Sequence, residues 1–419
     1  MTFFSLVFLS TFFWSSNVIS SENPGLFPVG ERESLIGNSG IAGVGSGGAL
    51  YYNPAALIEL EGLSLSVAGY AYLSYSIKTD PFVRVDGTDL NFSASGFTSI
   101  PSTAVSTFEW GKDKLLAVGI IIPEALVYND HQSFSTPNTR TDLAISETAQ
   151  DLRLGAGFGW RLSPKFSLGF AGFLNRYAKS AQAATTVLNT TSTNTMATSQ
   201  VFNDLVHYGL QFNVGGQFEF DKQWKAGAVF RLPLLGLGGG AKVLNLSTEL
   251  NSGTLTESRS LLEDTEVLRR NPWELGLGFS YQPTSHFQLL VDISVQGSGS
   301  YKEVPQDTNG STIDLETQAR VSLGSRIGLS ENFLLNLGVF YNPSAQRSVV
   351  SDNPFDQVLN FVGFSLGGEL KTGRTQTSLG LYVAKANNTA NVGTFVSDVG
   401  ASLVSAQVGF TYFLGDTAL

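Results

Sequence analysis

The residues of this chain that most resemble enzyme motifs are two glycine-rich strings and three histidines. Gly43–Gly48 has the spacing of a dinucleotide-binding fingerprint, but no strand precedes it and no acidic residue follows it in a βαβ unit. Gly363–Gly367 has the spacing of a nucleophile elbow, yet it lies inside an alternating segment and not at a strand-to-helix turn. His131, His207 and His286 are far apart and lack metal-ligand spacing. We therefore expect neither an enzyme nor a bound cofactor or metal.

Two lysines have positions from which they could bind an acidic ligand. Lys302 has the parity of Asp292 on the polar side of an alternating segment, and Lys179 lies on the polar side of another. A lysine that faces an apolar pocket can hold a carboxylate through a charge-assisted hydrogen bond. The alternative is that each is an ordinary lysine of a lumen or a rim.

The composition restricts the class of protein. Of the 419 residues 14% are charged, whereas soluble domains have about 25%, and the mean hydropathy is +0.08. After residue 20 no run of about 18 apolar residues occurs, so we expect no transmembrane helix. The absence of cysteine excludes disulfides, thiolate metal sites and a lipoprotein anchor. A net charge of -10 argues against a nucleic-acid partner.

The first twenty residues form a unit of their own. Phe3–Trp14 is an apolar run too short to span a bilayer, and Val18 and Ser20 have the small-residue spacing of a cleavage site. We interpret residues 1–20 as a signal peptide for Sec-type secretion, although no Lys or Arg precedes the apolar run. The alternative is a disordered or buried N-terminus.

From Leu63 onward apolar residues alternate with polar or small ones, which indicates strands with one apolar and one polar face. Residues on the polar face include the charged Arg153, Asp292 and Arg320. The strands run to about 10 to 16 residues, beyond the length usual in soluble sheets. The alternation is clearest in Leu152–Trp160, Val206–Phe220, Phe287–Gln296 and Arg320–Ile327.

The connections between the strands are unequal in length. Tight polar turns alternate with longer Thr/Ser/Asn-rich connections, and aromatic residues flank the turns, as at the two membrane interfaces of an outer-membrane barrel. Counting hairpins gives about 14 strands. The tight turns are Gly111–Lys114, Ser163–Lys165, Asp221–Gln223, Pro283–Ser285, Ser330–Asn332 and Thr372–Arg374.

The sequence therefore predicts an all-β fold, a transmembrane antiparallel β-barrel of about 14 strands with an N-terminal plug inside it. Residues 21–60, which include the glycine-rich Gly30–Gly48, form the plug, and residues 61–419 form the barrel. The inward parity places four aromatic side chains in the lumen, where they suit an apolar ligand pocket or pack against the plug. They are Phe173, Tyr177, Phe340 and Phe361.

Pro123 interrupts the third strand and is followed by Glu124 and Ala125. Proline lacks the N–H that a central strand donates, so at membrane depth it predicts a local opening of the wall, a lateral gate. The alternative is a tolerated bulge near the outer rim. Pro233 interrupts another strand, and there we expect a rim feature.

The order of a secreted N-terminus, a Gly/Ala/Ser-rich plug that ends in Asn53-Pro54-Ala55, and about 14 strands resembles the long-chain fatty acid transporter (FadL-type) family of outer-membrane proteins. The resemblance covers the whole mature chain. It implies that a hydrophobic ligand leaves the lumen sideways at an inward kink in the third strand, where Pro123 stands, and that a basic residue at Lys302 receives the ligand carboxylate.

Two features depart from the family pattern. The loops expected over Ala183–Asn203 and Glu249–Arg270 are shorter than the family's ligand-catching loops. The last aromatic residue, Phe413, lies six residues before the C-terminus instead of at it.

The functional expectation is passive uptake of hydrophobic small molecules, with long-chain fatty acids as the default ligand. The partners are then that ligand and outer-membrane lipid, and the protein is a monomer in the outer membrane of a diderm bacterium. One alternative is a structural or assembly-related barrel without transport, and another is a general porin for polar solutes.

Overall fold

The computed structural model describes residues 23–60, 62–85, 88–191, 195–308, 310, 312–347, 358–392 and 395–414. The signal peptide predicted over residues 1–20 lies outside them. In these ranges no helix is long and apolar enough to cross a membrane.

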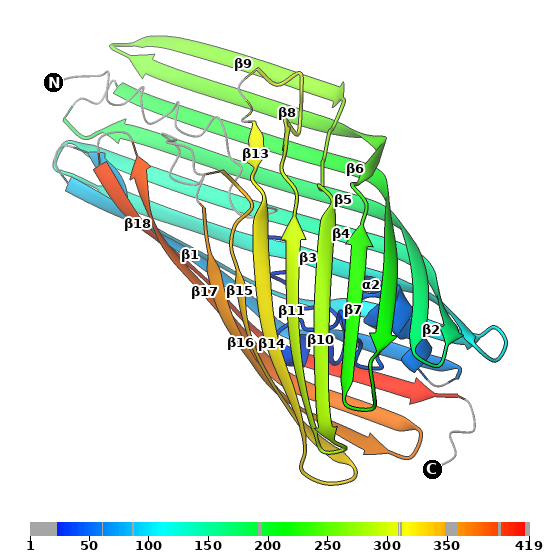
Figure 1. Cartoon of the computed structure of the whole chain (residues 1–419). Coiled ribbons are helices and arrows are strands. Elements are labelled where there is room, and N and C mark those ends of the chain that lie inside the picture. The colour runs from blue at the N-terminus through cyan, green and yellow to red at the C-terminus, as the bar shows by residue number, and fades with distance from the viewer. Residues whose placement is uncertain are drawn as a thin grey trace.

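Almost the whole described chain after residue 63 is strand (Figure 1). The strands are β1 (Ser64–Val85), β2 (Thr88–Glu109), β3 (Lys114–Ser135), β4 (Thr139–Ser163), β5 (Phe166–Asn189), β6 (Thr195–Glu219), β7 (Trp224–Arg231), β8 (Leu235–Asn251), β9 (Thr254–Thr265), β10 (Glu274–Thr284), β11 (Phe287–Gln296), β12 (Gly299–Tyr301), β13 (Ile313–Leu315), β14 (Gln318–Gly328), β15 (Phe333–Asn342), β16 (Phe361–Thr372), β17 (Thr375–Val392) and β18 (Phe395–Phe413). Before them come two 3-10 helices, η2 (Glu33–Ile36) and η3 (Pro54–Glu59), and the short α2 (Ala49–Tyr52).

Within the described residues, a closed antiparallel barrel of 14 strands forms, which confirms the predicted class. The ring runs from β1 through β7 in chain order, continues with β10, β11 and β14 to β18, and closes where β18 pairs with β1. The predicted tight turns all fall at connections between neighbouring strands. Closure matters because it gives each strand a hydrogen-bonding neighbour on both sides, as hydrocarbon requires.

The alternation predicted from the sequence sorts the side chains onto two faces of the wall. On β5, Leu168, Phe170 and Leu174 are exposed, whereas Ala171 and Phe173 are buried. The outward apolar side chains form the surface that faces lipid, and the inward ones form the lumen.

The wall is much taller on one side than on the other (Figure 1). β3 to β6 have 22 to 25 residues, whereas β10, β11, β14 and β15 have 10 or 11, close to the roughly 9–11 that span a bilayer. Above Leu174 the outward positions of β5 turn polar, as at Arg176 and Gln182. The tall half therefore projects beyond the membrane.

The height of the wall corrects the prediction of two loops in the outer part of the chain. Most of the predicted loops Ala183–Asn203 and Glu249–Arg270 are strand, because β5 continues to Asn189 and β9 occupies Thr254–Thr265. The Thr- and Ser-rich composition suggested loops, but β-branched threonine fits a pleated surface well. The hairpin of β8 and β9 extends the wall upward along β6 and lies outside the 14-strand ring.

The N-terminal segment, residues 23–60, lies inside the ring (Figure 1, dark blue). η3 contacts β3 to β6, and η2 contacts β14 to β17 on the opposite side. Nearly all of its residues are buried. Glycines in the wall make this close approach possible, because a Cβ at Gly169 would overlap the backbone of Pro54 and Ala55, and one at Gly338 would overlap that of Ile36.

The inward face of the upper wall carries a large buried apolar cluster, which also includes Leu26 and Phe27 of the N-terminal segment and which we call the upper core. It joins residues from both halves of the wall, including Tyr75 and Phe92 from β1 and β2, Tyr128 from β3, and Leu403 from β18.

The contact at Gly169 gives a prediction about how the segment is held. Gly169→Ala places a methyl group against backbone that cannot rotate away, so we expect docking of residues 23–60 to weaken by about 1–3 kcal/mol. Limited proteolysis of the folded barrel should then cleave this segment faster. Gly216→Ala is the matched control, since its methyl group would meet only side-chain atoms at 3.8 and 3.9 Å. Equal cleavage rates in both variants would contradict the account.

Candidate functional site

The ladder between β2 and β3 covers only the lower part of the two strands. It runs from Glu109↔Leu115 to Thr103↔Ile121 and stops there. On the other side of β3, the register with β4 shifts between Ile121 and Glu124. Pro123 lies in this shift and has no N–H to donate, which is a physical reason for the ladder to end at this point.

The two strands approach each other again higher up. A Cβ at Gly96 of β2 would overlap the carbonyl of Val127 in β3, and Gln132 Nε2 donates to the carbonyl of Ser93. Residues 97–102 and 122–126 lie between the end of the ladder and this close approach, and we call the space between them the β2–β3 gap; the ladder itself does not resume above it. Ala125, the third residue of the predicted gate, is buried at this gap.

Glu124 links the gap to the far side of the lumen. Its Oε2 lies 3.1 Å from Arg269 Nη2, in the connection between β9 and β10. The Arg269 guanidinium also lies 3.5 Å from the ring centroid of Tyr177 on β5. A cation between a carboxylate and an aromatic face is stabilised by both.

Lys179 faces the lumen as its parity predicts, and its Nζ lies 3.1 Å from Glu303 Oε2. Lys302 is placed differently from the prediction. β11 ends at Gln296, and Lys302 follows the short β12, so it belongs to no wall strand and the parity argument does not apply. The break falls at Gly297 and Gly299, which was the available signal, since glycine weakens a strand interior.

A cavity joins the β2–β3 gap to the arginines of the lumen. It has a volume of about 60 Å³, and Pro123, Glu124, Arg153, Arg231 and Arg269 are among its lining residues. The sequence predicted Arg153 only as a charge on the polar face of a strand, and neither Arg231 nor Arg269 was predicted as a site residue. The alternation predicts that Arg153 and Arg231 face inward, and Arg269 lies in a connection between strands. Neither fact shows that the three side chains meet at one cavity.

These arginines are held by carboxylates and by one aromatic ring. Arg153 binds Asp151 at 2.7 Å, and Arg231 pairs with Glu274. Both guanidinium groups also lie over Tyr51 of the N-terminal segment, at 5.6 and 5.1 Å from the ring centroid. The segment thus contributes cation–π contacts to the site.

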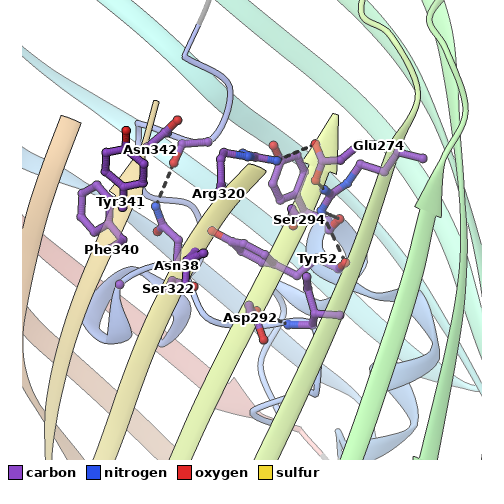
Figure 2. Close-up of a pocket in the computed structure, with 16 residues that line it drawn as sticks. Asn38, Tyr52, Glu274, Asp292, Ser294, Arg320, Ser322, Phe340, Tyr341 and Asn342 are labelled. Carbon is purple, nitrogen blue, oxygen red and sulfur yellow. Dashed lines mark hydrogen bonds and ion pairs between the residues drawn. The ribbon is translucent and has the colours of Figure 1, made fainter. Parts of the chain in front are cut away.

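A second cavity of about 60 Å³ lies between the N-terminal segment and β11, β14 and β15 (Figure 2). Arg320 reaches Glu274 at 2.6 Å on its upper side. Asp292 Oδ2 accepts hydrogen bonds from the backbone N–H groups of Gly40 and Ile41, at 2.7 and 2.9 Å. Asp292 therefore ties the glycine-rich part of the segment to the wall.

The four predicted lumen aromatics are all buried. Phe173 packs with the N-terminal segment, whereas Tyr177, Phe340 and Phe361 belong to the upper core. Phe340 stacks on Tyr382 at 5.0 Å and also lines the second cavity.

The motif Asn53-Pro54-Ala55 marks the start of η3. Asn53 is fully buried; its Nδ2 donates to the carbonyls of Ile41 and Gly216, at 2.7 and 3.1 Å, and its Oδ1 accepts from Ala55 N–H at 3.1 Å. Pro54 stands at the first helical position, where its missing N–H costs nothing. The motif thus joins two parts of the segment to the wall.

The lower side of the segment carries a second charged cluster. Glu369 of β16 lies 3.2 Å from both Arg32 and Arg326. Nearby, Glu33 is buried and accepts from Ser46 Oγ. Burial, and next the charge of Glu31, raise the pKa of Glu33 from 4.5 to about 7. In the described residues no three acidic or histidine side chains gather as metal ligands.

Comparison with known proteins gives a family and a set of similar folds. A family model described as outer membrane protein transport protein (OMPP1/FadL/TodX) matches residues 36–352. The Pseudomonas putida toluene transporter TodX has a TM-score of 0.67 and 14% identity, over 92% of this chain and 99% of that one. A search of curated proteins found no match.

Two further solved structures have the same fold. A Pseudomonas aeruginosa FadL homologue has a TM-score of 0.62 and 10% identity, over 93% of this chain and 99% of that one. The Ralstonia pickettii toluene transporter TbuX has a TM-score of 0.60 and 13% identity, over 94% and 99%.

The contacts of Asn53 predict the effect of removing its side chain. Asn53→Ala leaves buried backbone carbonyls without a partner, which costs about 1–3 kcal/mol in docking of the segment. We expect a folded barrel with faster proteolysis of residues 23–60 and lower uptake of a hydrophobic probe. Asn138→Ala, at an exposed loop tip, is the control. Unchanged uptake at equal surface expression would count against a functional role for the motif.

The raised pKa of Glu33 predicts a pH dependence. The folded protein binds this proton more tightly than the unfolded chain, so the stabilisation is complete below pH 4.5 and is lost as pH rises toward about 7. Thermal unfolding in detergent should show Tm falling over this range, and Glu33→Gln should flatten that slope. Glu331→Gln, in an exposed turn, should keep it. A slope unaffected by Glu33→Gln would refute the assignment.

Proposed function

The chain belongs to the outer membrane protein transport protein family (OMPP1/FadL/TodX), and from that membership we propose that it is a passive channel that takes up hydrophobic small molecules, with long-chain fatty acids as the default ligand. The family is one of transport channels of the outer membrane. We further propose that the protein has no catalytic role, acts as a monomer and reaches the membrane by Sec-type secretion.

The observation that carries the proposal is the end of the β2–β3 ladder beside a lumen cavity. Pro123 and Glu124 line that cavity, and the ladder stops two residues earlier, at Ile121. In hydrocarbon an interrupted ladder is costly unless polar groups line it, and Glu124 and Arg269 supply such groups. A ligand that reaches the cavity can therefore leave sideways into the membrane, through a gate formed by Pro123, Glu124 and Ala125.

The N-terminal segment has the position that a plug needs. It contacts opposite sides of the ring through η2 and η3. Its residues also line both cavities, beside the arginines and carboxylates of the wall. In this proposal it blocks passage along the barrel axis and directs the ligand to the β2–β3 gap.

The arginines that line the cavity at the gap favour a ligand with a carboxylate group. The cavity at the gap is lined by Arg153, Arg231, Arg269 and Arg270 against Glu124, Asp151 and Glu274. A surplus of guanidinium groups favours an acid, which an arginine can bind through two parallel hydrogen bonds. Lys179 and Lys302 remain candidates for the same carboxylate. TodX and TbuX are described as toluene transporters, so a neutral hydrocarbon is the natural comparison ligand.

The small cavities favour one alternative, a barrel with a structural role. A space of about 60 Å³ is too small for a fatty acid, so transport requires that the upper core or the N-terminal segment move. A structural barrel would need no such movement. Measurement of uptake distinguishes a transport channel from a structural barrel. A large steady conductance in planar bilayers would distinguish a porin from both.

The gate can be closed by a cysteine pair, because the chain has no cysteine of its own. Ser102 and Ile122 are the next residues beyond the last ladder pair, Thr103↔Ile121, and both are buried. In cells that lack their own transporter of this family, oxidation of Ser102→Cys/Ile122→Cys should reduce oleate uptake to the level of cells without the channel. Reduction of the disulfide should restore it.

Ser106→Cys/Val118→Cys is the matched control, since these residues already face each other in the ladder. Its oxidation should leave uptake unchanged. Full uptake through the oxidised Ser102/Ile122 variant would exclude the β2–β3 gap as the exit.

A further inference from the structure

The wall has a second interruption beside β6, on the same tall side of the ring as the β2–β3 gap. β8 pairs with β6 along its whole length, from Leu235↔Leu210 to Asn251↔Thr195. On its other side, β8 pairs with β9 only from Ala241↔Thr265 upward. Among the described residues, 235–240 therefore have no ladder partner on this side, and residues 266–273, which connect β9 to β10, run opposite them. We call this interruption the β8 seam.

The seam is bounded at both ends. Its upper end is the pair Ala241↔Thr265, next to Asp264, a non-glycine residue at φ 52°. Its lower end is the hydrogen bond from Leu234 N–H to the carbonyl of Asn271, at 3.0 Å. Within it Gly238 has φ 122°, a left-handed conformation that breaks the pleat of β8. The seam is thus a local opening of the ladder and not a frayed strand end.

Residues 235–240 are all exposed, and four of them are glycine. A Cβ at Gly238 or Gly240 would meet no atom within 4 Å, whereas one at Gly239 would overlap the carbonyl of Val206 in β6. The outer border of the seam is apolar, because Leu235 and Leu237 are 53% and 59% exposed. Just below, Phe230 and Trp273 stack at 6.4 Å, in the manner of an interfacial aromatic belt.

The connection that runs opposite residues 235–240 also lines the cavity that reaches the β2–β3 gap. Arg269, Arg270, Asn271 and Pro272 line it, and Arg270 is also exposed at the outer surface. The Arg269 side chain is buried and aimed into the cavity, and its Nη1 has no hydrogen-bond partner in the described part of the chain. An unpaired buried guanidinium N–H is costly, and an acidic ligand would supply the missing acceptor.

We propose that the β8 seam is the entrance of the channel, through which a long-chain carboxylate enters the lumen sideways from the outer rim of the membrane. The carboxylate binds first at Arg270 and then at Arg269, and the tail passes over the glycines of β8. Since Arg269 also holds Glu124, the arriving carboxylate competes with that side chain and loosens the gate.

This inference rests on the proposed function, and a second cysteine pair tests it. Ala241 opposes Thr265, so Gly240 and Glu266 are the next facing positions below the last rung. Oxidation of Gly240→Cys/Glu266→Cys closes the seam and should reduce oleate uptake to the level of cells without the channel, with recovery on reduction. Thr248→Cys/Glu257→Cys, which joins partners in the intact ladder of the same hairpin, should leave uptake unchanged.

A single-cysteine variant tests the seam even if the disulfide between positions 240 and 266 does not form. Gly240→Cys, labelled with a bulky maleimide after the barrel has folded, should lower oleate uptake in the same way. If neither closure nor labelling at the seam changes uptake, while the Ser102/Ile122 disulfide blocks it, the seam is not the entrance and the proposed function stands. If the unmodified protein takes up no oleate, the proposed function itself fails.

Discussion

In hydrocarbon each backbone N–H and C=O must find a partner within the chain, and this constraint explains the ring of β-strands. It makes the wall's irregularities informative, because an open ladder at membrane depth persists only where something else satisfies or shields the freed groups. The β2–β3 gap is such a place, whereas the β8 seam begins at the outer rim, because Leu235 pairs with Leu210 and Leu210 pairs with Leu174. Glycine and proline produce them, the first by leaving space and the second by lacking the N–H.

The interior is organised in layers of different polarity. The N-terminal segment lies in the lower lumen, arginines and carboxylates line the cavities above it, and the apolar upper core lies beyond them. Buried ion pairs of this kind cost desolvation and contribute little net stability. In the proposed uptake path their value lies in exchange, since Arg269 keeps a carboxylate partner when a ligand displaces Glu124.

The sequence predicts the parts of this structure that depend on local period. Alternation, tight turns and the count of strands follow from it, because a half-buried strand repeats every two residues wherever it pairs. Pro123 could be singled out because its chemistry is local. What the sequence does not show is which chain segments meet: the approach of Arg269 to Glu124 depends on the lumen's geometry.

Two expectations were wrong for the same reason. Lys302 was assigned to a wall strand that ends at Gln296, and the tall hairpins of β5 with β6 and β8 with β9 were interpreted as loops. A strand ends where its neighbours stop pairing with it, and the sequence of one strand does not determine that position.

The pairing of β1 with β18 has a consequence for how the protein is made. Ser66 and Thr411 meet across 345 positions of chain, so this contact carries a large loop-closure cost and cannot form before the last strand exists. The N-terminal segment precedes β1 and touches walls on both sides of the ring. During assembly it can gather the early and late strands around itself, so that a part of the finished lumen first serves as the scaffold on which the ring closes.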